Sequence, residues 1–116
     1  MGRKSNIEII VNEISEGFKG VIVDKYAPRD TQPTHLKIRI SETYINVSPY
    51  REIVERASIG DSIIKPKNEN YIYLIKPDGR KTRIFYTKIS YETRKSKFFP
   101  EEWKDKWLES SAWDQK

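Results

Sequence analysis

The sequence predicts a mainly β (α+β) domain, a small antiparallel β-barrel or sandwich of about six strands with short helices at the N-terminus, mid-chain and C-terminus. Short runs rich in Ile, Val and Tyr alternate with polar or basic residues, which is typical of strands with one buried face. The segments between these runs are short and rich in Gly, Pro, Asn and Asp, so we expect neighbouring strands to pair antiparallel.

The chain has the size of one domain. Its 116 residues contain no cysteine, so stability is expected to come from packing alone. Composition divides it into a disordered polar start, a helix, a β-barrel and an aromatic helical tail. These segments are residues 1–5, 6–16, 18–91 and 98–113 of a single domain over residues 1–116.

A capping signal and an aliphatic stripe predict the N-terminal helix. Ser5 and Glu8 have the spacing of a capping box, in which each side chain bonds the backbone N–H of the other residue. Aliphatic residues then recur at helical spacing, namely Ile7, Ile10, Val11 and Ile14. We expect this helix to end near Gly17.

The barrel segment is expected to resemble an OB or SH3 fold. The predicted strands are residues 18–26, 35–40, 44–47, 62–65, 71–76 and 81–91. A second helix is predicted behind Ser48 and Pro49, which suit the N-cap and first helical positions. The apolar phase of the strands predicts an inward set of Val21, Val23, Leu36, Ile38, Ile40, Ile63, Ile72, Leu74, Ile84 and Tyr86.

The C-terminal tail carries all three tryptophans of the chain. Pro100 suits the first position of a helix, and Trp103 and Trp107 are spaced one helical turn apart. We therefore predict a helix from Pro100 to Ser110 that docks on the barrel through Phe99, Trp103 and Trp107. The alternative is that the tryptophans form a recognition platform.

One short string has the form of a catalytic motif. Gly60, Asp61, Ser62 and Ile63 resemble the nucleophile block of the GDSL esterase family, which implies Ser62 as nucleophile and a histidine near the C-terminus as its base. The one histidine of this chain, His35, precedes the serine, so no base follows it. We expect Ser62 to be structural and the protein not to be an enzyme.

The sequence predicts no metal and no cofactor. With one histidine and no cysteine, only an oxygen-ligand site remains, for which Asp24, Asp30 and Asp61 are the candidates. Scattered carboxylates in a chain that is 34% charged are usually solvated. The chain also has no glycine-rich phosphate loop.

The net charge of +5 comes from the middle of the chain. Residues 65–97 carry 10 basic and 3 acidic groups, whereas residues 1–64 carry 9 of each and residues 98–116 carry 3 and 5. Within the surplus, basic residues are interleaved with aromatic ones, as on the strands of barrels that bind single-stranded nucleic acid. The candidate binding residues are Arg80, Lys81, Arg83, Tyr86, Lys88 and Tyr91, together with Trp113 in the tail.

Two functions fit this pattern. The first is a non-enzymatic β-barrel binding or interaction module, in which the basic residues protect edge strands or contact a protein or a polyanion. The alternative is an OB-like single-stranded nucleic-acid-binding protein. We expect any nucleic-acid binding to be weak and independent of sequence, because no base-reading element is visible.

No run of residues is apolar and long enough to span a bilayer, and the start of the chain is polar. As the sequence stands it predicts a soluble, cytoplasmic protein. A signal peptide removed from before Met1 and Gly2 would instead make it an exported one.

The order of these motifs resembles a known kind of protein. The segments Phe18-Lys19-Gly20-Val21, Gly60 to Lys65, Tyr71-Ile72-Tyr73 and Phe99 to Trp103 follow an N-terminal helix. This order is similar to that of small bacterial β-barrel proteins of unknown function, of the kind solved in structural-genomics programmes. The resemblance covers residues 6–113 and implies a compact β-barrel with no assigned activity.

Overall fold

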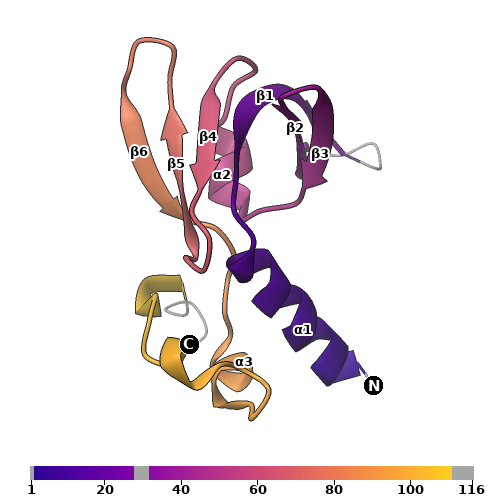
Figure 1. Cartoon of the computed structure of the whole chain (residues 1–116), viewed down its shortest axis with the longest axis vertical. Coiled ribbons are helices and arrows are strands. Elements are labelled where there is room, and N and C mark those ends of the chain that lie inside the picture. The colour runs from indigo at the N-terminus through magenta and orange to yellow at the C-terminus, as the bar shows by residue number, and fades with distance from the viewer. Residues whose placement is uncertain (1, 28–31, 111–116) are drawn as a thin grey trace.

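The computed structural model describes residues 2–27 and 32–110 and confirms a β-rich α+β fold (Figure 1). Six antiparallel strands form one sheet in the order β3-β2-β1-β4-β5-β6. The edge strands β3 and β6 do not pair with each other, so the sheet is not closed into a barrel. The strands are β1 Phe18–Tyr26, β2 His35–Ile40, β3 Thr43–Val47, β4 Ser62–Lys65, β5 Tyr71–Ile75 and β6 Lys81–Phe85, and the helices are α1 Gly2–Ser15, α2 Arg51–Arg56 and α3 Tyr91–Lys95.

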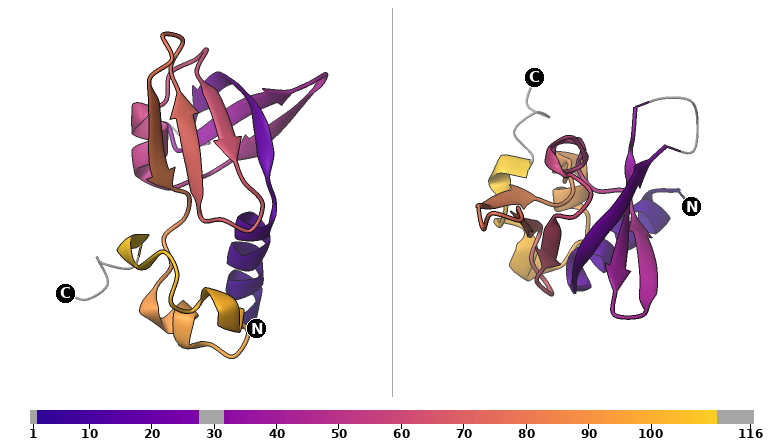
Figure 2. Two further views of the ribbon diagram at one scale, coloured as in Figure 1. Left: turned by 60° about the vertical axis from the view of Figure 1, so that its left-hand side comes forward. Right: turned by 90° about the horizontal axis from the view of Figure 1, so that it is seen from above.

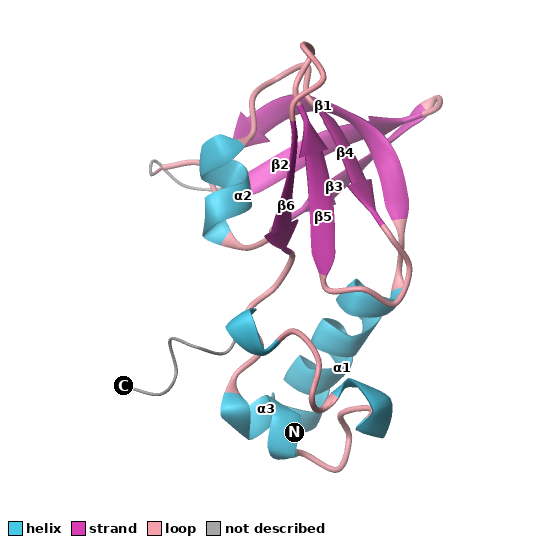
Figure 3. Ribbon diagram, turned by 90° about the vertical axis from the view of Figure 1, so that its left-hand side faces the viewer, coloured by secondary structure: helices cyan, strands magenta, loops and turns pink. Residues whose placement is uncertain are grey.

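The main core lies between α2 and one face of the curved sheet, which we call the inner face (Figure 3). Helix α2 contributes Ile53, Val54 and Ala57, which pack against the inward side chains of the strands. The predicted inward residues that are buried are Leu36, Ile38, Ile63, Ile72, Leu74, Ile84 and Tyr86. Ile40 is half-buried against the same cluster.

The predicted inward phase of β1 is wrong. Ile22 is fully buried, whereas its neighbours Val21 and Val23 are only half-buried. Three consecutive β-branched residues carry no alternation, so the sequence offers no signal for the phase. A β-bulge between Ile22 and Asp24 also shifts the pairing of β1 with β2.

Close packing of β1 on β2 requires a glycine. A Cβ atom on Gly20 would clash with the backbone carbonyl oxygen of Arg39 and lie 2.7 Å from the Ile38 side chain. The strand can therefore curve from β4 at its start to β2 at its end.

A second, smaller core joins α1 to the C-terminal segment at one end of the sheet (Figure 2). Its buried residues are Ile14, Ile89, Phe99 and Trp103, and Ile10, Val11 and Trp107 pack against them. The aliphatic stripe predicted for α1 therefore packs in this second core through Ile10, Val11 and Ile14. The tail packs on α1 and Ile89, which corrects the expectation that it docks on the barrel.

The predicted helix over residues 100–110 is also wrong. The segment has a short 3-10 turn, Glu101–Trp103, and the backbone of Trp107 has a φ of 56°, which no α-helix accommodates. The third α-helix is instead α3, where the Ser90 side chain accepts a hydrogen bond from the Thr93 N–H. The long strand expected over residues 81–91 is shorter in the structure, because β6 ends at Phe85 and a loop connects it to α3, which begins at Tyr91.

A buried guanidinium holds the turns of this tail. Arg94, only 5% exposed, donates hydrogen bonds to the carbonyl oxygens of Lys104 at 3.2 Å, Lys106 at 2.5 Å and Trp107 at 2.6 Å. These carbonyls belong to successive turns and lack the intrahelical partners that an α-helix would provide. The fork of the guanidinium therefore replaces the helical hydrogen bonds of the tail.

Lys65 ties α1 to the sheet in the same way. Its side chain is buried, and its Nζ atom donates to the carbonyl oxygens of Ile14 and Glu16, both at 2.7 Å, and of Pro66 at 3.0 Å. Two of these acceptors lie at the C-terminal end of α1, where carbonyl groups lack partners and attract cations. Burial lowers the pKa of Lys65 to about 8, against the opposing effect of Glu69.

This pKa predicts a pH dependence of stability. The unfolded chain, with a lysine pKa near 10.4, keeps the proton that the folded protein loses above pH 8, so unfolding free energy rises with pH in this window. Between about pH 7.5 and 9.5 we expect the wild-type protein to gain roughly 2 kcal/mol relative to Lys65→Met, measured by urea denaturation. The exposed control Lys67→Met should keep the wild-type pH profile. Equal profiles for the wild-type protein and Lys65→Met would contradict the assignment.

Candidate functional site

The face of the sheet opposite α2, which we call the outer face, carries basic and aromatic side chains on neighbouring strands. Cross-strand partners point to the same side, so the register places Lys19 with Ile64, Ile64 with Tyr73, and Tyr73 with Arg83. In the same way Val21 pairs with Arg39 and with Ser62. The outer face therefore includes Lys19, Val21, Asp24, Lys37, Arg39, Ser62, Ile64, Tyr71, Tyr73, Ile75, Lys81 and Arg83.

Two cations on β6 lie over two tyrosine rings on β5. The Nζ atom of Lys81 is 4.9 Å from the centre of the Tyr73 ring, and the guanidinium carbon of Arg83 is 5.0 Å from that of Tyr71. The two rings contact each other edge-on, with centroids 5.5 Å apart. This is the arrangement of cation–π pairs, which holds both the charges and the rings in place at the surface.

The surroundings of Tyr71 disfavour ionisation of its hydroxyl group. Desolvation and the hydrogen bond with Tyr73 raise the pKa of Tyr71, and nearby Arg83 opposes this shift. The Tyr71 hydroxyl therefore adds no negative charge to the outer face at physiological pH.

A shallow hollow lies beside these pairs on the outer face. It has a volume of about 580 Å³ and is lined by aliphatic residues Val21, Ile64 and Ile75 with Lys19 and Arg39 at its sides. Lys19 and Arg39 are exposed. The hollow continues the basic and aromatic surface from β5 and β6 to β1 and β2.

Basic side chains outnumber acidic ones on the outer face of the described strands. Within the described strands, the acidic residue on this side is Asp24, whose register partner is Lys37. The basic residues Lys19, Arg39, Lys81 and Arg83 of this face are exposed. A local surplus of basic side chains favours contact with anions.

Of the residues predicted to bind, Lys81 and Arg83 lie on this face, and the others are elsewhere. Arg80 lies in the turn between β5 and β6, where its Nε atom donates to the Asp78 carboxylate at 2.8 Å. Tyr86 is buried on the inner side, as its predicted inward phase required, so its ring is not a surface platform. Lys88 is exposed between β6 and α3, and Tyr91 begins α3. Trp113 lies outside the described residues.

The hydrolase motif and the candidate metal ligands have ordinary structural roles. Ser62 pairs with Val21 and His35 with Tyr26, which places the two roughly 17 Å apart along β1. The buried carboxylate of Asp61 accepts hydrogen bonds from the Ser58 N–H and from Lys76 Nζ at 2.6 Å. Asp30 lies outside the described residues. No cluster of three metal-ligating side chains exists within residues 2–27 and 32–110.

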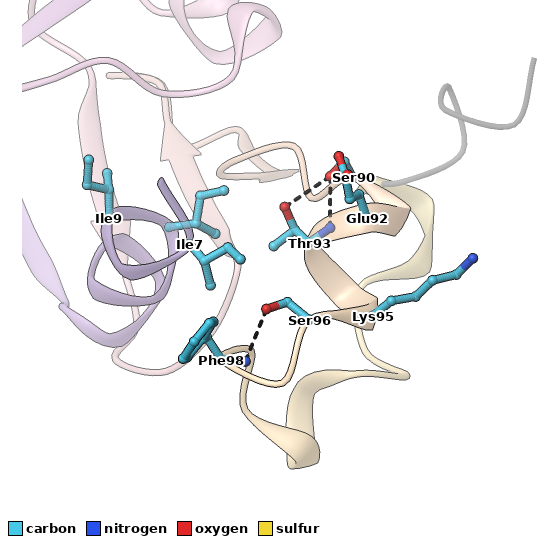
Figure 4. Close-up of a pocket in the computed structure, with 9 residues that line it drawn as sticks. Ile7, Ile9, Ser90, Glu92, Thr93, Lys95, Ser96 and Phe98 are labelled. Atoms are coloured by element: carbon cyan, nitrogen blue, oxygen red, sulfur yellow. Dashed lines mark hydrogen bonds between the residues drawn. The ribbon is translucent and has the colours of Figure 1, made fainter. Parts of the chain in front are cut away.

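A second surface feature is a groove of about 730 Å³ between α1 and α3 (Figure 4). Its walls combine Ile7, Ile9 and Phe98 with the hydroxyl groups of the α3 segment. These hydroxyls take part in local bonds: Ser90 Oγ donates to Thr93 Oγ1, and Ser96 Oγ accepts from the Phe98 N–H. The other polar residues lining the groove are Glu92 and Lys95.

Sequence reasoning missed Tyr71 and Tyr73 as members of the basic surface. The polar phase of β6 and the tyrosine spacing of β5 are visible in the sequence, but the pairing of β5 with β6 is not. That pairing brings Lys81 over the Tyr73 ring and Arg83 over the Tyr71 ring.

Among the residues that the structure describes, no helix is long and apolar enough to cross a membrane. No protein-family model, curated protein or solved structure matches this chain.

Proposed function

We propose that this protein is a binding module, not an enzyme, and that its outer face holds single-stranded nucleic acid without reading its sequence. The observation that carries the proposal is the pairing of Lys81 with Tyr73 and of Arg83 with Tyr71 on an open, positively charged sheet face. Binding of this kind needs cations for the phosphates and aromatic rings for the bases.

The geometry supports an extended ligand. Adjacent strands lie roughly 4.8 Å apart, so the distance from Arg39 on β2 to Arg83 on β6 spans several nucleotides of an extended strand. The phosphates would contact Lys19, Arg39, Lys81 and Arg83, and bases would stack on the tyrosine rings and on the apolar hollow between them. In the part of the chain that the structure describes, α2 packs on the opposite, inner face, so the outer face presents strands and not a helix that could enter the groove of a duplex, which favours single strands.

A second explanation of the same charges is protection of a sheet edge. Strand β6 is an edge strand, and Lys81 and Arg83 are the residues that would discourage pairing with another chain. Edge protection explains the basic residues of β6. It does not explain Lys19 and Arg39, which lie on the interior strands β1 and β2. It predicts no affinity for nucleic acid, so a binding measurement separates the two.

The test is fluorescence anisotropy with labelled oligothymidylate and oligoadenylate of about 12 nucleotides. We expect similar affinity for both, with Kd of about 10⁻⁶ to 10⁻⁴ M at low salt. Four phosphate contacts predict a decrease in affinity of roughly 50-fold between about 50 and 200 mM salt. Tyr73→Val, which keeps a strand-forming residue but removes the ring, should weaken binding by roughly 5-fold or more.

A matched pair of double variants controls for net charge. Lys81→Ala/Arg83→Ala removes two charges from the outer face and should halve the salt dependence. Arg51→Ala/Lys95→Ala removes two charges from exposed positions on α2 and α3 and should bind like the wild-type protein. Equal loss in both double variants, or no binding at low salt, would overturn the proposal in favour of edge protection.

A further inference from the structure

A separate cavity of about 360 Å³ lies between the end of α1, the start of β1 and the edge strand β3. Its polar lining consists of Glu13, Glu16, Asn46 and Ser48, and its apolar lining of Phe18, Ile45 and Val47, with Tyr86 also in its wall. These residues belong to the inner side of the sheet, so the cavity is distinct from the outer face. Its volume is at the small end of the range for ligand sites.

The cavity carries negative charge in a basic protein. Glu13 lies in the last turn of α1, Glu16 follows the last residue of the helix, Ser15, and both carboxylate residues line the cavity. Within the described part of the chain, neither carboxylate forms a salt bridge. The nearby ammonium group of Lys65 does not neutralise them by contact, because its three N–H groups are bonded to carbonyl oxygens. Burial raises the pKa of Glu13, and Lys65 opposes this shift.

Tyr86 supplies a polar group that has no partner. Its side chain is 5% exposed, and its hydroxyl forms no hydrogen bond with the residues that the structure describes. Every fully buried side-chain nitrogen or oxygen of these residues has a partner, so the Tyr86 hydroxyl is not sealed in the core. Tyr86 lines this cavity, which is therefore where its hydroxyl reaches open space. A nearly buried tyrosine is rarely left without a hydrogen bond, so the arrangement points to a ligand that provides one.

We propose that this cavity binds a small organic amine in its protonated form. The ammonium group donates hydrogen bonds to the Glu13 carboxylate and to the Tyr86 hydroxyl oxygen, and Glu16 adds negative charge at the entrance. The apolar body of the ligand lies against Phe18, Ile45 and Val47. A metal cation is a poorer fit, because it would leave the apolar lining of Phe18, Ile45 and Val47 without a contact.

The probe for this site is benzylamine, compared with benzyl alcohol as its neutral counterpart and benzoate as its anionic one. Titration of the full-length protein up to about 20 mM ligand, followed by amide NMR spectra, should show Kd near 1 mM for benzylamine. The shifted amides should include those of Phe18 and Val47. The alcohol and the benzoate should bind at least roughly tenfold more weakly.

Isosteric variants identify the residues responsible. Glu13→Gln should weaken benzylamine binding roughly tenfold and Tyr86→Phe roughly threefold, because each removes one polar contact while keeping the shape of the cavity. The exposed Glu55→Gln on α2 should leave the affinity unchanged and serves as the control for net charge. The proposal is overturned if the cavity amides do not shift, if benzyl alcohol binds as well as benzylamine, or if Glu13→Gln binds like the wild-type protein.

Discussion

Replacing Trp103 with alanine is expected to lower the unfolding free energy by about 3 to 5 kcal/mol, a large share of the ~5 to 15 kcal/mol typical of such domains. Trp103 is 7% exposed and packs edge-on against Phe99 and Trp107, with ring centroids 6.1 and 5.5 Å away. Its removal leaves a cavity in the smaller core, beside Ile14 of α1. Urea denaturation followed by circular dichroism measures the loss.

The matched control for this substitution is Leu108→Ala, because Leu108 is an apolar residue of the same segment that is 54% exposed. It should change the unfolding free energy by less than about 0.5 kcal/mol. If Trp103→Ala were as stable as the wild-type protein but lost a partner, the tryptophans would be a recognition platform, and the packing role assigned to them would be wrong.

Replacing Arg94 with methionine is expected to release the tail, at a cost of about 3 to 5 kcal/mol. The substitution keeps a long side chain on α3 but leaves the carbonyl groups of Lys104, Lys106 and Trp107 without their donor. Each buried acceptor left unpaired costs about 1 to 3 kcal/mol, and detachment of the tail limits the total. All three tryptophans of the chain lie within residues 103–113, so a red shift of tryptophan fluorescence reports this release directly.

Lys95→Met is the control for Arg94→Met, because it removes a neighbouring positive charge from an exposed position on the same helix. Its fluorescence and denaturation midpoint should match those of the wild-type protein. An unshifted spectrum for Arg94→Met would mean that hydrophobic contacts alone order the tail.

The strands with clear alternation were predictable from sequence. Leu36 and Ile38 in β2, and Ile72 and Leu74 in β5, alternate with polar or amphipathic residues, and all four are buried as expected. β1 could not be phased, since its apolar run has no alternation and its bulge depends on pairing with β2. Closure of the sheet likewise depends on strand curvature, which no local pattern encodes.

The tail was not predictable from local signals. The spacing of Trp103 and Trp107 favours a helix. In the structure, however, the Arg94 guanidinium donates hydrogen bonds to backbone carbonyls that would be bonded within such a helix. Arg94 appeared in the sequence only as one charge of a basic stretch. Lys65 is a similar case, because nothing near it in sequence indicates that it caps α1. Long-range contacts of this kind decide the structure of segments whose own helical preference is weak.

The same limit applies to the outer face. Sequence reasoning identified Lys81 and Arg83, but grouped them with neighbours along the chain such as Lys88 and Tyr91. The sheet groups them instead with residues of other strands, above all Tyr73, which pairs with Arg83 across the β5–β6 ladder.

The most direct test of the central claim is an amide NMR titration of the protein with oligothymidylate at low salt. Binding on the outer face predicts shifts at Lys19, Tyr71, Tyr73 and Arg83, with the amides of α2 and of the tail unchanged, and predicts that the shifts vanish at about 200 mM salt. Shifts confined to residues 88–110, or an unchanged spectrum at saturating oligonucleotide, would contradict it.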